Sequence, residues 1–231
     1  MKKSLISIAA GSFLAAISAS GTLLITEIQS NQNFASGEDF FEITNFGNSA
    51  VDLTGWTYDD SSNNPAVGFN FGELSIAAGE SIVFVEDLTA EAFRTWWGIP
   101  DTVQVVTYSG SGLGLGQDDA VNIFDADDNL VLSLSYAAGG FNQTGGTPSL
   151  GGHAGLSAGG TQVYQSLVWD GVSDPTSPEY TFAVAGTLGA FQAASGLDVG
   201  SPGVVPEPGS FGALVGLLAL GLGLSRRRAR A

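Results

Sequence analysis

Residues 39–59, DFFEITNFGNSAVDLTGWTYD, restrict the fold more than any other stretch of the chain. Phe41 and Ile43 fall on one side of an extended segment, whereas Glu42 falls on the other side. This period of two is the pattern of a β-strand with one buried face. The stretch therefore predicts a strand whose Phe41 side faces a hydrophobic core.

A turn and a second apolar segment follow that strand. Residues 45–49, NFGNS, supply turn chemistry, because Asn and Gly tolerate left-handed backbone and Ser or Asn bonds to nearby main chain. Leu53 and Trp56 then return apolar side chains to the core. We expect Phe41, Ile43, Leu53 and Trp56 to be buried, with a contribution of roughly 1.5–3 kcal/mol each. This corner therefore builds the core and is not a reaction centre.

Similar strand patterns recur along the chain, separated by turn-forming residues. We expect strands at residues 23–29, 67–71, 81–85, 103–108, 120–124, 130–136, 162–169 and 180–184. Residues 139–160 are rich in Gly, Ser and Thr and are expected to form a long loop. Residues 198–206 are expected to form a flexible stalk.

One helix is predicted, at residues 89–97. Phe93, Trp96 and Trp97 gather on one face of such a helix, and Gly98 ends it. We expect these aromatic side chains to plug one end of a sandwich. The two adjacent tryptophans leave a second interpretation open, in which they form a platform for sugar rings.

The order of these motifs resembles the lamin-tail domain. The segments that carry the resemblance are ITEIQSN, DFFEITN, GNSAVDLTGW, IAAGESIVFVED, TAEAFRTWWGIP, GQDDAVNIFDADDNLVLSLSY and a closing GSPG. The likeness covers residues 22–203, although residues 40–43 read FFEI where the family has an IEL core preceded by Trp. It implies an all-β fold, an immunoglobulin-like β-sandwich with one short helix, and no shared catalytic set.

The N-terminus, residues 1–21, has the pattern of a secretory signal peptide. Lys2 and Lys3 precede an apolar run at residues 5–17, and small residues at 18–20 offer a cleavage site. The alternative is a buried N-terminal helix. The pattern predicts export and processing by signal peptidase.

The C-terminus, residues 204–231, combines three features in a fixed order. A Pro-Glu-Pro motif comes first, an apolar run at residues 209–225 is long enough for a thin membrane span, and an arginine cluster follows. The residues concerned are Pro206, Glu207, Pro208, Arg226, Arg227 and Arg228. Because arginines stay cytoplasmic, the preceding domain would lie on the far side of the membrane.

This tail resembles the PEP-CTERM sorting signal of Gram-negative bacteria. The resemblance implies that an exosortase recognises residues 206–208 and cleaves nearby, after a transient anchorage in the inner membrane. The protein would then reach the outer surface or the extracellular matrix. The alternative is an ordinary C-terminal anchor with a chance Pro-Glu-Pro.

The distribution of charge along the chain limits the molecules that the protein can bind. All 23 carboxylates lie between Thr22 and Pro208, where Arg94 is the only basic residue. Repulsion at this density disfavours binding to nucleic acid or to an anionic surface. The chain has no cysteine, so an exported domain is held by its core, without disulfides or thiolate metal sites.

Few residues support catalysis. His153 is the only histidine and lies in the Gly-rich segment, so a zinc site or a Ser-His-acid system has little to build on. Asp125, Asp127 and Asn129 present alternate oxygen ligands, as calcium loops do, but the sequence departs from an EF-hand. These residues equally suit a plain hairpin turn.

Taken together, these patterns predict an exported, non-enzymatic protein with a structural or adhesive role. Its expected partners are signal peptidase and exosortase during export, and exopolysaccharide or other surface proteins afterwards. No cofactor is expected. Two alternatives stay open, a calcium-dependent surface binding module and a secreted hydrolase.

Overall fold

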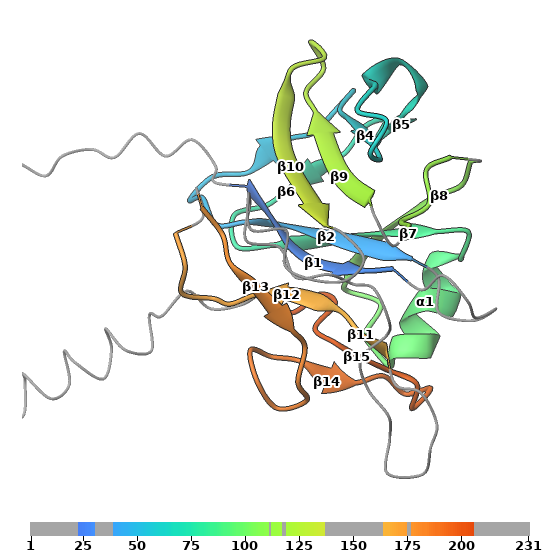
Figure 1. Ribbon diagram of the computed structural model, residues 1–231, viewed down its shortest axis with the longest axis vertical. Coiled ribbons are helices and arrows are strands. Elements are labelled where there is room, and N and C mark those ends of the chain that lie inside the picture. Colours follow the sequence, from blue (N-terminus) through green and yellow to red (C-terminus); the bar gives the residue numbers. More distant parts are fainter. Residues whose placement is uncertain are drawn as a thin grey trace, which may run out of the picture.

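The central sheet of the fold has six strands. They are β1 (Leu23–Gln29), β2 (Phe40–Asn45), β7 (Ser81–Glu86), β8 (Gln104–Tyr108), β12 (Leu167–Trp169) and β13 (Tyr180–Phe182). Their order is β13-β12-β1-β2-β7-β8, and every pair is antiparallel except β7 and β8. The computed structural model describes residues 23–30, 39–110, 112–116, 119–136, 164–174 and 177–205 (Figure 1).

A second sheet packs against one face of the central sheet. Its strands are β4 (Thr57–Asp59), β5 (Phe69–Asn70), β9 (Asp119–Phe124) and β10 (Leu130–Tyr136), in the order β10-β9-β4-β5. A short ladder joins β3 (Val51–Asp52) to β6 (Ser75–Ile76). The largest apolar cluster fills the space between the sheets and includes Phe41, Ile43 and Leu53. The predicted all-β sandwich is therefore confirmed, with these three residues in its core.

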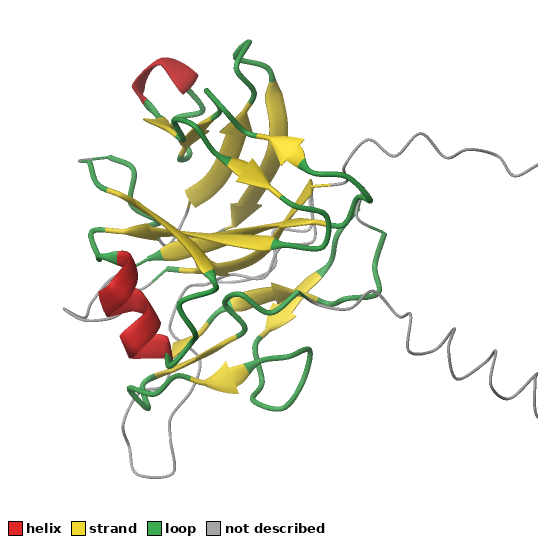
Figure 2. Cartoon of the chain, turned by 180° about the vertical axis from the view of Figure 1, so that it is seen from behind, coloured by secondary structure: helices red, strands yellow, loops and turns green. Residues whose placement is uncertain are grey.

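A third layer covers the other face of the central sheet. It consists of helix α1 (Ala90–Trp97) and a small sheet of β11 (Tyr164–Gln165), β15 (Asp198–Gly200) and β14 (Phe191–Gln192). Figure 2 shows the helix on the opposite side of the central sheet from the four-stranded sheet. The central sheet is thus covered on both faces.

Burial on both faces corrects the expectation of a strand with one buried face. Phe41 of β2 points into the sandwich, whereas Phe40 belongs to a second cluster with Phe93 and Trp97 of α1. Glu42 shares the face of Phe40, because alternate residues of a strand lie on one side. It is fully buried, and this burial sets up the polar cluster described below.

The helix forms as predicted, but it does not lie at the end of the sandwich where we expected it. Thr89 caps it, since its Oγ1 accepts a hydrogen bond from Ala92 N at 3.2 Å, and Gly98 ends it in left-handed backbone. The rings of Phe93 and Trp97 pack edge-on against Phe40 at 5.3 and 5.6 Å between centroids. The helix therefore covers a sheet face and does not plug an end of the sandwich.

One further expectation was wrong, and two were confirmed only in part. Residues 198–206 do not begin as a flexible stalk, since Asp198 lies in β15 and is fully buried. Trp56 only partly enters the core, where it packs against the main cluster from the side. The strand predicted at residues 67–71 is reduced to β5, because a 3₁₀ turn spans Pro65–Val67.

The terminal signals lie outside the described residues, as do the Gly-rich segment 139–160 and His153. Within the part of the chain that the structure describes, no helix has the length and apolarity needed to cross a membrane. The predicted signal peptide and the predicted span at residues 209–225 stay predictions.

Candidate binding site

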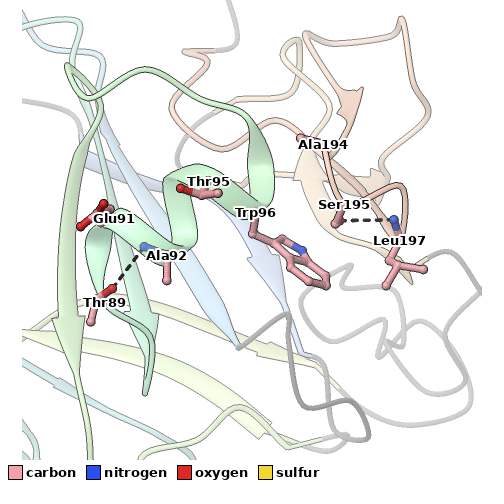
Figure 3. Close-up of a pocket in the computed structure, with 8 residues that line it drawn as sticks. All are labelled: Thr89, Glu91, Ala92, Thr95, Trp96, Ala194, Ser195 and Leu197. Atoms are coloured by element: carbon pink, nitrogen blue, oxygen red, sulfur yellow. Dashed lines mark hydrogen bonds between the residues drawn. The ribbon is translucent and has the colours of Figure 1, made fainter.

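An open pocket of about 680 Å³ lies between α1 and the segment that joins β14 to β15. Figure 3 shows the Trp96 side chain extending from the helix toward Leu197. The lining residues are Thr89, Glu91, Ala92, Thr95, Trp96, Ala194, Ser195 and Leu197. An indole, a carboxylate and several hydroxyl groups therefore border one space.

The helix places Trp96 at this pocket because its neighbour Trp97 takes the buried position. Trp97 is 2% exposed and contacts Phe40 and Phe191, so it anchors the helix to the sheet. Adjacent residues on a helix point about 100° apart, and Trp96 is therefore turned toward the β14–β15 segment. Only one of the two tryptophans is thus available to a ligand.

A hydrogen bond fixes the edge of the Trp96 ring. Its Nε1 donates to Oδ2 of Asp198 at 2.5 Å, and Oδ1 of the same carboxyl group accepts from Gln29 Nε2 at 2.6 Å. Desolvation by burial raises the pKa of Asp198, and these two hydrogen bonds oppose that rise. The buried carboxyl group of Asp198 on β15 therefore fixes the orientation of the indole ring.

Two more carboxyl groups are buried beside this region, and we call Glu27 and Glu42 the buried carboxyl pair. Glu27 accepts hydrogen bonds from Ser201 N at 2.9 Å, from Ser201 Oγ at 3.0 Å and from Ser166 Oγ. Glu42 accepts from Thr26 Oγ1 at 2.7 Å and from Gly203 N at 2.5 Å. The pair therefore binds the C-terminal segment to the central sheet.

Burial makes both carboxyl groups of this pair weaker acids than an exposed glutamate. Desolvation raises the pKa of Glu27 to about 7, against the hydrogen bonds from Ser166 and Ser201. Desolvation first, and then repulsion from Glu27, raise the pKa of Glu42 to about 8. A carboxyl group in a low-dielectric site favours its neutral form. Both side chains are fully buried, so their role is to hold the fold and not to contact a substrate.

The predicted calcium residues lie together in the hairpin loop between β9 and β10. Oδ1 of Asp125 accepts from the backbone N–H groups of Asp127 and Asn129, both at 2.9 Å, and Asn129 Nδ2 reaches both carboxylate oxygens. These bonds lower the pKa of Asp125. Among the described residues, no three His, Cys, Asp or Glu side chains form a group that could hold a metal ion.

The sorting residues cannot be placed in the same way. Pro206, Glu207, Pro208 and the arginines at 226–228 lie outside the described residues. The last residue that the structure describes, Val205, directly precedes the Pro-Glu-Pro motif.

Sequence reasoning missed Asp198 and the buried carboxyl pair. A signal was present for Glu27 and Glu42, because each is the only charged residue in its strand, LLITEIQ and FFEITN. Asp198 gave no comparable signal, since its strand has three residues. The link from Trp96 to Asp198 joins residues 102 positions apart and is visible only in the fold.

A sandwich of β-sheets with one short helix is consistent with an immunoglobulin-like β-domain. A sequence model of the lamin tail domain matches residues 16–138, more than half of the chain. The chain belongs to the lamin tail domain family, whose immunoglobulin-like domains are typically non-catalytic. A comparison with curated proteins found no match.

The family match and the pocket overlap only in part. The matched residues include α1, whereas the segment 194–197 on the opposite wall lies beyond them. The pocket is therefore lined by residues on both sides of position 138, where the family match ends.

Proposed function

We propose that this chain is an exported, non-enzymatic protein of the cell surface or extracellular matrix, with a structural or adhesive role. Signal peptidase would remove residues 1–21, and an exosortase would recognise Pro206-Glu207-Pro208. The host would be a Gram-negative bacterium, with transient anchorage in the inner membrane through residues 209–225. Exopolysaccharide or other surface proteins are the expected partners.

The position of the sorting motif supports this proposal most strongly. Ser201 and Gly203 are bound to the buried carboxyl pair, so the folded domain continues almost to Pro206. The Pro-Glu-Pro motif, the apolar run and the arginine cluster all follow that boundary. A protease that acts at this motif would release the domain without cutting into it.

The charge of the domain is a second line of support. Arg94, the only basic residue between the two terminal segments, donates to the backbone oxygen of Val103 at 3.1 and 2.8 Å. The many carboxylates keep an exported domain soluble and repel anionic surfaces. Contact with neutral or cationic material fits such a surface.

The proposal is tested in the host by replacing Glu207 with Ala and following the protein by cell fractionation. We expect an uncleaved precursor to accumulate in the inner membrane, with little protein at the surface. Glu73→Ala, at an exposed position of the sandwich, serves as the matched control and should be processed normally. Normal processing and surface delivery of both the Glu207→Ala variant and a chain lacking residues 206–231 would overturn the sorting function.

A further inference from the structure

The pocket beside α1 presents a rigid aromatic surface. Trp96 is half-buried, and its ring edge is bound to Asp198, which Gln29 holds in turn. Part of the ring packs against the cluster of Phe40, Phe93 and Trp97, and Nε1 is already engaged, so the ring offers a ligand its remaining apolar surface and not its donor. A side chain locked in this way loses little conformational entropy when a ligand stacks on it.

Hydroxyl groups line the same pocket (Figure 3), Thr89 at the N-terminal end of the helix and Ser195 on the opposite wall. Thr89 Oγ1 accepts from Ala92 N, and Ser195 Oγ accepts from Leu197 N at 3.3 Å, as Figure 3 shows. A hydroxyl group that accepts one hydrogen bond still carries its own proton and can donate it. An apolar ring contact combined with hydroxyl groups elsewhere along the same pocket matches a chain of pyranose rings, which have C–H groups on their faces and hydroxyl groups around their edges.

Charge narrows the class of sugar. Glu91 is an exposed carboxylate on the pocket wall, and of the lining residues that the structure describes none is basic. A uronic acid or a sulfated sugar would meet a carboxylate without a compensating cation, whereas an amino sugar would gain one. The volume of about 680 Å³ falls in the range of small-ligand sites.

We propose that this pocket binds neutral or amino-sugar units of a polysaccharide, with Trp96 as the stacking surface and Glu91 as the group that excludes anionic sugars. This assignment rests on the proposed adhesive function, for which it names the ligand class. Asp198 acts as a positioning residue that fixes the indole ring.

The test is isothermal titration calorimetry on the full chain, purified in detergent, with dextran, cellohexaose, a chitosan hexamer and an oligogalacturonate. We expect at least one of the first three probes to bind and the oligogalacturonate to give no signal. Trp96→Ala should weaken the binding about tenfold or more, because it removes the stacking face. Glu91→Gln should weaken the binding of the chitosan hexamer and leave the binding of the neutral sugars unchanged. Glu73→Gln, which lies outside the pocket, should change the affinity for none of the probes.

A second variant tests the pocket without removing Trp96, in case Trp96→Ala fails to fold. Ala92→Trp fills the pocket from an exposed helix position and leaves Trp96 in place, so it should also abolish binding. The assignment is overturned if none of the three probes binds at millimolar concentration, if both variants bind as the parent chain does, or if the oligogalacturonate binds best. A protein that reaches the surface without binding any probe refutes the sugar site alone, whereas one that binds sugar but stays inside refutes the proposed function alone.

Discussion

Glu27 and Glu42 are cross-strand partners on β1 and β2, and neither side chain is exposed to solvent. Two carboxyl groups at such a position are stable only when burial keeps them protonated or hydrogen bonds satisfy them. Both conditions hold, since their pKa values rise to about 7 and about 8 and Ser201 and Gly203 donate to them. The pair thereby joins the C-terminal segment to the sandwich.

The first prediction is that stability falls as the pH rises from 5 to 8. The pKa of each group is higher in the folded chain than its ordinary value near 4.5, so the folded chain holds protons that the unfolded chain releases. The contribution is complete below pH 4.5 and is lost as the pH rises through 7 and 8. Urea unfolding at several pH values should therefore show a free energy of unfolding that falls steadily as the pH rises through this window.

Glu42→Gln is the matched test of that slope. A glutamine can accept from Gly203 N with its oxygen and donate to Thr26 Oγ1, which leaves the shape of the cluster unchanged. We expect the slope between pH 5 and 8 to become smaller, whereas Glu73→Gln at an exposed site should keep it. An unchanged slope in the Glu42→Gln protein would show that this pair does not titrate in the window.

The second prediction concerns where the domain ends. A chain that stops at Val205 should unfold like the full chain, because it keeps β15 and the donors Ser201 and Gly203. A chain that stops at Leu197 loses those donors and Asp198. Unpaired buried polar groups cost about 1–3 kcal/mol each, so this chain should be unfolded or have a much lower midpoint of thermal unfolding. Equal midpoints for the two chains would instead support the flexible stalk that the sequence predicted at residues 198–206.

The sequence is a good guide to the sandwich and a poor one to the small sheet of β11, β15 and β14, for physical reasons. Phe41 and Ile43 show the core face of β2 because alternation over several residues is a local signal. The strand β15 has three residues and forms its contacts with β11 and β14. Such short strands are defined by partners distant in sequence, so local pattern cannot reveal them.

The polar contacts of β1 illustrate a second limit. Its pairing with β2 shifts register between Ile25 and Glu27, a bulge that a plain alternation of residues 23–29 does not contain. Because of that shift, Glu27 pairs with Glu42, and Thr26 bonds to the same carboxyl group. In the sequence Glu27 and Glu42 lie in separate strands with no sign of contact, and the register of β1 and β2 makes them neighbours.

The third prediction compares two tryptophans. Trp97→Ala removes a fully packed ring between Phe40 and Phe191 and should cost about 3–5 kcal/mol of unfolding free energy. Trp56→Ala should cost less than that, since this ring is only partly buried. Chemical denaturation of both variants measures the difference. A larger loss for Trp56→Ala would mean that the sandwich and not the helix layer carries the tighter packing.

The fourth prediction concerns calcium. The carboxylate of Asp125 already accepts hydrogen bonds from Asp127 and Asn129, which close the turn between β9 and β10. We therefore expect calorimetry with 1 mM calcium, a concentration typical of extracellular sites, to give no saturable heat. Saturable heat that disappears when Asp125 and Asp127 are both replaced by Asn would favour the calcium-dependent binding module instead.

The central claim is that this acidic domain works outside the cell, and labelling of intact cells tests it most directly. The chain has no cysteine, so Val172→Cys, at a side chain that is 79% exposed, introduces one accessible thiol. A membrane-impermeant maleimide should label this variant on intact host cells, and should not label Val168→Cys, which is buried in β12. Labelling of Val172→Cys only after cell lysis would contradict the surface location.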